Sequence, residues 1–206
     1  MIRNILFDLG NVLIDIDVRR TLRAYQALLG VEEERGRGVG TTVITAGDLI
    51  GAGESEIVAK YQVGAISTEE FVDAVLPACK PGTTRQDVID AWMAMLIGIP
   101  EARRQKLAEL HEQGYKLYVL SNINELHAEW TREQLQGIPF EAVFFSNEIR
   151  MAKPDMRCYE HVIRKTGIKP EETLYIDDLP ANIEAGQGMG FQCFLNTKAD
   201  EWVEHV

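Results

Sequence analysis

The chain has 206 residues, 46% of them hydrophobic, and its 21 lysines and arginines against 32 aspartates and glutamates give a formal net charge of −11. A chain of this length buries about 70% of the surface that it exposes when unfolded, so we expect a substantial core. The acidic balance argues against nucleic acid as a partner, because binding to phosphates needs clustered cations.

The N-terminal apolar run is broken by Asp8, Asp15 and Asp17, so it is too short to span a membrane and does not resemble a targeting segment. The three cysteines are odd in number and widely spaced, with no C-x-x-C pair, which argues against a disulfide framework and a zinc site. We therefore predict a reduced, cytoplasmic protein with no membrane partner.

Short runs of β-branched and aromatic residues predict strands. The runs are continuously apolar instead of alternating, as strands buried on both faces of a parallel sheet require. In chain order they cover residues 4–8, 116–121, 142–145, 173–178 and 191–195.

Amphipathic segments between these runs predict helices that open at a proline and end at a glycine. They run from Pro100 to Gly114, from Pro154 to Gly167 and from Pro180 to about Gly188. Strand–helix–strand alternation predicts right-handed crossovers and a parallel sheet covered by helices on both faces.

Residues 18–99 depart from this alternation, because they show helical periodicity and no clear strand. We predict an α/β protein in which a Rossmann-like core (1–17 and 100–206) carries an all-helical insert (18–99). Within the insert, the acidic, glycine-rich stretch 30–51 contains GRGVG at 36–40. Because that motif does not lie between a strand and a helix, a plain loop is favoured over a phosphate-binding loop.

Polar residues follow the predicted strands at the end where parallel sheets bind ligands. Three carboxylates at one edge would repel one another without a counter-charge, and Mg²⁺ is a cation that carboxylates and phosphate oxygens bind together. These edge residues are Asp8, Ser121, Asn122, Lys153, Asp177 and Asp178.

Their chemistry suits phosphoryl transfer. A carboxylate such as Asp8 can attack phosphorus to form an aspartyl-phosphate, while a metal ion neutralises the developing charge. The Ser121 hydroxyl and the Asn122 backbone amide can hold phosphate oxygens, and Lys153 adds a positive charge. Each residue alone is weak support, because strand-end aspartates are commonly turn or cap residues.

Four motifs in order are similar to those of the haloacid dehalogenase-like (HAD) hydrolase superfamily. They are FDLGNVL (7–13), LSN (120–122), KPD (153–155) and YIDDLPANIEAG (175–186). The resemblance covers nearly the whole chain, and the predicted insert is similar to the C1-type helical cap of many members. It implies a phosphatase of the kind that acts on small metabolites.

The resemblance also implies residue roles. Asp8 is implied to be the nucleophile and a metal ligand, and the Gly10 carbonyl a second Mg²⁺ ligand. Asp178 matches a further ligand, with Asp177 binding directly or, preferably, through water. Asn182 is implied to orient a metal-bound water or a carboxylate.

The chain departs from the phosphatase pattern at Gly10, where these enzymes carry an aspartate that protonates the leaving oxygen. Such general acid catalysis contributes about 10²–10⁴-fold in rate. Either the leaving group is good enough to depart without this acid, or Asp15, Asp17, a cap residue or water replaces it. Similar bacterial sugar-phosphate phosphatases share the DLGNV sequence, so we expect weakened activity and not its loss.

We therefore predict Mg²⁺-dependent hydrolysis of a small phosphorylated metabolite, with a sugar phosphate preferred. One alternative is a metal-independent 2-haloacid dehalogenase, in which Asp8 would attack carbon, although such enzymes lack the acidic pair at 177–178. Another is a weakly active or non-catalytic binding protein. His127, which follows LSNINEL, is a candidate for the entrance of the site, although a surface position is favoured. The sequence does not specify an oligomeric state.

Overall fold

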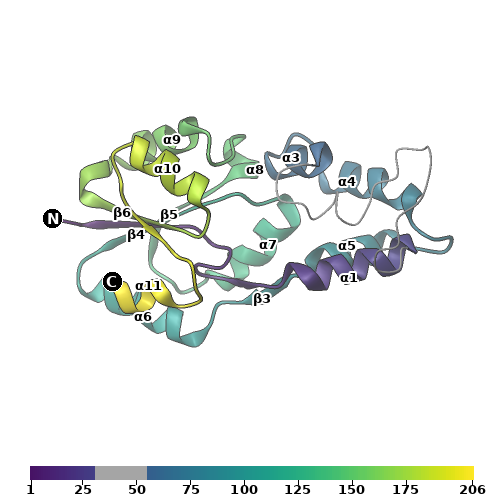
Figure 1. Cartoon of the computed structure of the whole chain (residues 1–206), viewed down its shortest axis with the longest axis horizontal. Helices are drawn as coiled ribbons and strands as arrows, with labels where there is room; N and C mark the ends of the chain where they lie inside the picture. The colour runs from purple at the N-terminus through teal and green to yellow at the C-terminus, as the bar shows by residue number, and fades with distance from the viewer. Residues whose placement is uncertain (31–54) are drawn as a thin grey trace.

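The computed structural model describes residues 1–30 and 55–206 (Figure 1). Most of the glycine-rich stretch 30–51, including GRGVG, lies outside the described residues. The predicted α/β architecture is confirmed: five parallel strands form one sheet in the order β5-β4-β1-β6-β7. The strands are β1 (Asn4–Phe7), β4 (Lys116–Ser121), β5 (Phe140–Phe145), β6 (Thr173–Asp177) and β7 (Gln192–Leu195).

Helices cover both faces of this sheet, as Figure 1 shows. On one face lie α6 (Glu101–Glu112), α7 (Glu125–Gln134) and α11 (Glu201–His205), and on the other α9 (Met156–Thr166) and α10 (Pro180–Gly188). Two short pieces, α8 (Ser146–Ile149) and the 3₁₀ turn η2 (Pro170–Glu172), complete the core. No helix among the described residues is both long and apolar enough to cross a bilayer.

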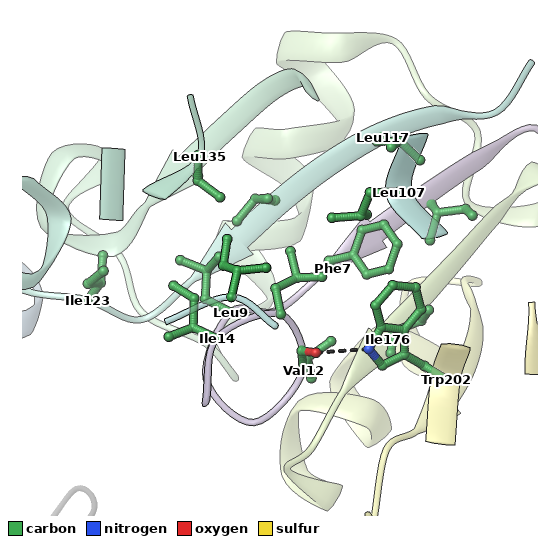
Figure 2. Packing of buried hydrophobic residues seen from close by; sticks show 14 of the residues in the cluster. Phe7, Leu9, Val12, Ile14, Leu107, Leu117, Ile123, Leu135, Ile176 and Trp202 are labelled. Atoms are coloured by element: carbon green, nitrogen blue, oxygen red, sulfur yellow. Dashed lines mark hydrogen bonds between the residues drawn. The ribbon is translucent and has the colours of Figure 1, made fainter. Parts of the chain in front are cut away.

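The face of the sheet that the C-terminal helix α11 covers carries a hydrophobic cluster that includes Phe7 and Trp202 (Figure 2). Their rings meet edge to face at 5.0 Å between centroids, an arrangement that aromatic pairs favour. The Trp202 indole Nε1 donates a hydrogen bond to the Val12 carbonyl at 2.8 Å. The end of the chain therefore supports the loop that follows β1.

One predicted helix begins later than its proline suggested. Pro154 lies in a turn, and α9 starts at Met156 because the Asp155 carboxylate accepts a hydrogen bond from the Arg157 backbone N–H and caps the helix. Pro154 and Lys153 are consequently part of the loop at the strand-end edge of the sheet and not of the helix.

The insert is a separate helical layer, at the right of Figure 1. Its elements are α1 (Val18–Leu29), α3 (Glu56–Gln62), α4 (Thr68–Val75), the 3₁₀ turn η1 (Leu76–Ala78) and α5 (Arg85–Met93). They enclose a cluster of their own in which the aromatic rings of Tyr25, Tyr61, Phe71 and Trp92 pack together.

A short antiparallel pair of strands joins the insert to the core. It consists of β2 (Asp15–Ile16) and β3 (Leu96–Gly98), and the Asp17 N–H also bonds to the Met95 carbonyl at 2.8 Å. β3 lies inside the segment predicted to be all helical. A three-residue strand carries no periodicity of its own, and it forms only because a distant partner pairs with it.

Candidate active site

The sheet brings two predicted carboxylates together. β1 and β6 are neighbours, with Phe7 opposite Ile176, and the Asp8 N–H bonds to the Ile176 carbonyl at 2.9 Å. Asp8 and Asp177 therefore leave adjacent strands at the same edge, and Asp178 follows directly. Each of the three aspartates has a carboxylate oxygen within 4.8 Å of one on each of the others.

Lys153 supplies the cation of this cluster. Its Nζ lies 2.8 Å from Asp8 Oδ1 and 2.6 Å from Asp177 Oδ2, and the side chain is buried. Burial opposes the charge, but the attraction of the two carboxylates outweighs it and raises the pKa of Lys153 above its usual value. The lysine is therefore a fixed positive charge between the two strand ends.

Asn122 holds Lys153 in place through the main chain. The Asn122 side chain donates to the Lys153 carbonyl at 2.8 Å and accepts from the Lys153 N–H at 2.7 Å. Ser121 ends β4, the neighbour of β1 on the side away from β6, and its side chain is buried. Both residues lie where the sequence placed them, and the Asn122 side chain has a positioning contact that was not anticipated.

Asp177 is surrounded by hydrogen-bond donors. Besides Lys153, it accepts from the Tyr175 hydroxyl, from the Leu179 N–H at 2.9 Å and from the Asn182 amide at 2.9 Å. An ionised carboxylate offers about four acceptor positions, and four donors occupy them here. Asp177 is thus arranged to hold Lys153, while one of its carboxylate oxygens lies within 4.8 Å of an oxygen on each of the other two aspartates.

Two features of the sequence account for these contacts. Tyr175 and Asp177 are two residues apart on β6, so their side chains project from the same face of the strand. Gly186 lets α10 approach that face, since a Cβ there would lie 2.6 Å from Tyr175 Cδ1. Asn182, one of the implied residues, contacts the carboxylate of Asp177.

Asp178 is held from the loop after β1. Asn11 donates to Asp178 Oδ2 at 2.9 Å, and Asn11 is itself held by a hydrogen bond from Asn196 to its carbonyl at 2.9 Å. Asn11 has φ 56, a left-handed conformation that asparagine tolerates better than most residues. This contact was not predicted, although the asparagine of DLGNV is the available signal. Gly10 precedes it and pairs with Ile14 in an isolated bridge.

The cluster carries more negative than positive charge, which the carboxyl pKa values reflect. Burial is the largest influence on Asp8 and raises its pKa to about 6, because Lys153 offsets only part of that effect and Asp177 and Asp178 add repulsion. Burial also raises the pKa of Asp178. In Asp177 the attraction of Lys153 and the hydrogen bonds overcome burial and lower the pKa. A hard cation bound among these three carboxylates would offset their mutual repulsion.

The residues proposed to replace the missing acid have other partners. Asp15 Oδ1 forms an ion pair with Nη2 of the buried Arg103 at 2.8 Å, and Arg103 Nε also pairs with Asp200 Oδ1 at 2.6 Å. Asp17 caps α1 by accepting from the Arg19 N–H at 3.0 Å. Both carboxylates therefore stabilise the connection between core and insert.

A cavity of about 240 Å³ lies between the loops after β1 and β4 and the insert, and Gly10, Ser121 and Asn122, neighbours of the cluster in the chain or through hydrogen bonds, border it. His127 also lines it, so the expectation of a surface histidine was wrong. The imidazole is buried, stacks on Trp92 at 5.5 Å between centroids, and lies 3.2 Å from the Trp92 carbonyl. Burial lowers the pKa of His127 to about 4, so the neutral ring donates from Nε2 to that carbonyl.

Comparison with known proteins identifies relatives over the whole chain. A sequence profile of haloacid dehalogenase-like hydrolases matches residues 2–190. The chain is 25% identical over 213 residues to D-ribitol-5-phosphate phosphatase of Bacteroides thetaiotaomicron, covering 100% of this chain and 97% of that protein. It is 34% identical over 100 residues to the sesquiterpene phosphatase AstK of Aspergillus oryzae, covering 44% of this chain and 47% of that protein.

Solved structures agree with these sequence comparisons. A HAD family enzyme from Bacteroides thetaiotaomicron, crystallised with magnesium and inorganic phosphate, superposes with a TM-score of 0.78 and 27% sequence identity. The match covers 95% of this chain and 94% of that structure. The likeness therefore includes both the sheet and the helical insert.

Proposed function

Because the chain belongs to the haloacid dehalogenase-like hydrolase family, we propose that it is a Mg²⁺-dependent hydrolase of small phosphomonoesters that acts through an aspartyl-phosphate on Asp8. The observation that carries this proposal is the cluster of Asp8, Asp177 and Asp178, the first two of which are buried and paired with Lys153. Such a cluster has too few cations of its own and lies at the edge of the sheet where ligands bind.

The residues present fit magnesium. Asp8, Asp178 and the Gly10 carbonyl would hold the ion, and Asp177, which already accepts from four donors, would bind it through water. Bound there, Mg²⁺ neutralises the charge of carboxylate and phosphate so that they can approach each other. The magnesium and phosphate held by the related crystal structure support this assignment.

The chain's own residues carry the reaction. An Asp8 oxygen bonds to phosphorus as the bond from phosphorus to the alcohol oxygen breaks, and water supplies the alcohol's proton. A second water then attacks phosphorus, which releases inorganic phosphate and restores the carboxylate. Ser121 and the Asn122 N–H bind phosphate oxygens, and Lys153 holds Asp8 and stabilises the transferring group.

We assign residues 1–17 and 100–206 to the catalytic core and 18–99 to a cap that closes over the phosphate. Within the substrate class, a sugar phosphate is supported by the relative named D-ribitol-5-phosphate phosphatase, which spans the whole chain. The partial relative named as a sesquiterpene phosphatase shows that related enzymes serve very different alcohols. Sugar phosphates are thus the first reference substrates for this enzyme.

Phosphate release from a panel of phosphomonoesters tests the proposal. We expect release with Mg²⁺, its loss on adding chelator, and its loss in Asp8→Asn, with Asp90→Asn on the exposed surface of α5 as the control. Full activity of Asp8→Asn would exclude the covalent route. Chloride release from 2-chloropropionate without metal would instead support a dehalogenase, and magnesium and phosphate binding without turnover would support a non-catalytic protein.

A further inference from the structure

The cavity beside the catalytic cluster has an unusual lining for a sugar site. It is about 240 Å³ in volume, and no Lys, Arg, Asp or Glu among the described residues lines it. Most of its wall is aliphatic or aromatic, with contributions from the loop after β1, from the connecting strands and from the cap. These wall residues include Leu9, Ile14, Ile16, Val58, Trp92 and Leu96.

Several polar groups of the wall already form hydrogen bonds within the protein. Asn124 accepts from the His127 N–H at 3.1 Å, and the His127 ring donates to the Trp92 carbonyl. Ser121 and Asn122 lie at the end that borders the catalytic cluster. Two further polar atoms of the lining residues, the Trp92 indole Nε1 and the Thr131 hydroxyl, have no hydrogen-bond partner within the described residues, but both atoms are buried. The Gln62 amide is therefore among the few accessible side-chain groups that could pair with the several hydroxyl groups of a polyol.

Burying a hydroxyl without a hydrogen-bond partner is unfavourable, whereas apolar surface gains free energy when it leaves water. A cavity of about 150 Å³ accommodates benzene, so this one has room for a six-membered ring with a short substituent. Resting on the proposed phosphomonoester hydrolysis, but departing from the sugar phosphates that the relative's name supports, we propose that the cavity binds the alcohol part of the substrate and selects small, predominantly hydrocarbon alcohols over polyols.

The glycine at position 10 points in the same direction. A leaving group that is a weak base departs without a proton from the enzyme, and a phenol, with a pKa near 10 as in tyrosine, is such a group. Aromatic alcohols therefore suit both the shape of the wall and the chemistry beside it. Apolar aliphatic alcohols share only the first advantage.

A matched pair of esters separates binding in the cavity from leaving-group chemistry. Cyclohexylmethyl phosphate and glucose 6-phosphate are both primary alkyl phosphates next to a six-membered ring, and they differ chiefly in ring hydroxyls. With Mg²⁺, we expect kcat/KM to be at least about tenfold higher for the cyclohexylmethyl ester, since an apolar pocket already discriminates by about 10²-fold against a single added hydroxyl. Equal or higher kcat/KM for glucose 6-phosphate would overturn the proposal.

Phenyl phosphate in the same assay reports phosphoryl transfer independently of this choice. If phenyl phosphate and both alkyl esters release no phosphate, the proposed function itself fails; if phenyl phosphate is hydrolysed but the sugar ester is preferred, only the selectivity fails. Val58→Thr adds a hydroxyl to the wall at nearly constant volume and should lower the cyclohexylmethyl-to-glucose ratio severalfold. Ile97→Thr, on β3 but exposed, is the control and should leave that ratio unchanged; no change in Val58→Thr would contradict the proposal.

Discussion

The catalytic edge of the core and the helical cap are built in opposite ways. At the edge, buried charges are held by hydrogen bonds whose donors come from strand ends and helix starts, as around Asp177. In the cap, aromatic rings such as Tyr61 and Phe71 stack, with centroids 4.6 Å apart, and among the described residues only a few hydrogen bonds reach the core. Chemistry is thus positioned by hydrogen bonds and backbone, whereas the cavity is shaped by side-chain volume.

The difference has an energetic basis. A buried charge that loses its partner destabilises a protein strongly, so each position at the catalytic edge tolerates little change. Apolar packing accepts replacements of similar volume at modest cost. Selectivity can therefore change in the cap while the reaction at the edge of the sheet stays the same, and substitutions in the two regions should differ in kind.

The largest effect is expected at Lys153. Lys153→Met leaves Asp8 and Asp177 buried without their cation, so the free energy of unfolding at pH 7 should fall by about 3–5 kcal/mol, with phosphate release lost. Urea denaturation and the phosphatase assay measure both. Lys165→Met, exposed on α9, should change stability by less than about 0.5 kcal/mol. A stable, active Lys153→Met would contradict the role given to this ion pair.

Two phenylalanine truncations compare the packing of the two regions. Phe7→Ala in the sheet and Phe71→Ala in the cap should each lower the free energy of unfolding by about 3–5 kcal/mol, in each case for the region into which the side chain packs. Hydrogen exchange should rise throughout the sheet for Phe7→Ala but mainly in α1, α3, α4 and α5 for Phe71→Ala, because cooperative units open separately. The same exchange pattern for both variants would show that core and cap unfold together.

A smaller, pH-dependent effect is expected at His127, where the cap meets the core. Its pKa falls from 6.5 to about 4 on folding, so the neutral ring stabilises the fold above pH 6.5 and this stability is lost as the pH falls towards 4. The difference is worth about 3 kcal/mol. The His127→Gln side chain can still donate to the Trp92 carbonyl, so the melting temperature of this variant should fall less between pH 6.5 and 4 than that of the wild type. The melting temperature of the control His111→Gln, on the surface, should fall as much as that of the wild type.

The missing acid offers a gain-of-function test. Gly10→Asp should raise kcat on alkyl phosphates by about 10²-fold, which is the lower end of what a general acid contributes in enzymes. A Cβ at this position would lie 3.3 Å from Ile16 Cδ1, so Ile16 must shift slightly. Gly10→Ala controls for that shift. An equal gain on phenyl phosphate would show that leaving-group protonation is not what limits the wild type.

The smallest effect is expected where the cap is fastened to the core. The Thr68 hydroxyl bonds to Glu125 at 2.5 Å and to the Tyr61 hydroxyl at 2.8 Å. Thr68→Val removes these bonds while the Thr68 N–H remains on Glu125, so about 1 kcal/mol of docking energy is lost. Steady-state kinetics should show a raised KM with little change in kcat, and Thr83→Val should show neither. A fall in kcat alone would assign Thr68 a different role.

The parallel sheet could be predicted because its signals are local. A strand buried on both faces must be apolar at every position, and the prediction of 116–121 agrees with β4. Helix starts were less certain, as the later beginning of α9 shows, because a capping side chain and not the proline set the first turn. β2 and β3 gave no usable signal, since each is too short to form without its partner.

Asp8, Lys153 and Asp178 could be named as candidates from their places after predicted strands, since parallel strands end at one edge of a sheet. That Asp177 holds Lys153, and that His127 is buried against Trp92, depends on contacts between residues far apart in the chain. The sequence by itself determined the elements and the edge at which polar residues gather, because backbone periodicity and strand direction are local properties. Only the tertiary structure decided which donors each carboxylate accepts from and how apolar the cavity is, because burial and hydrogen-bond partners exist only once distant segments pack together.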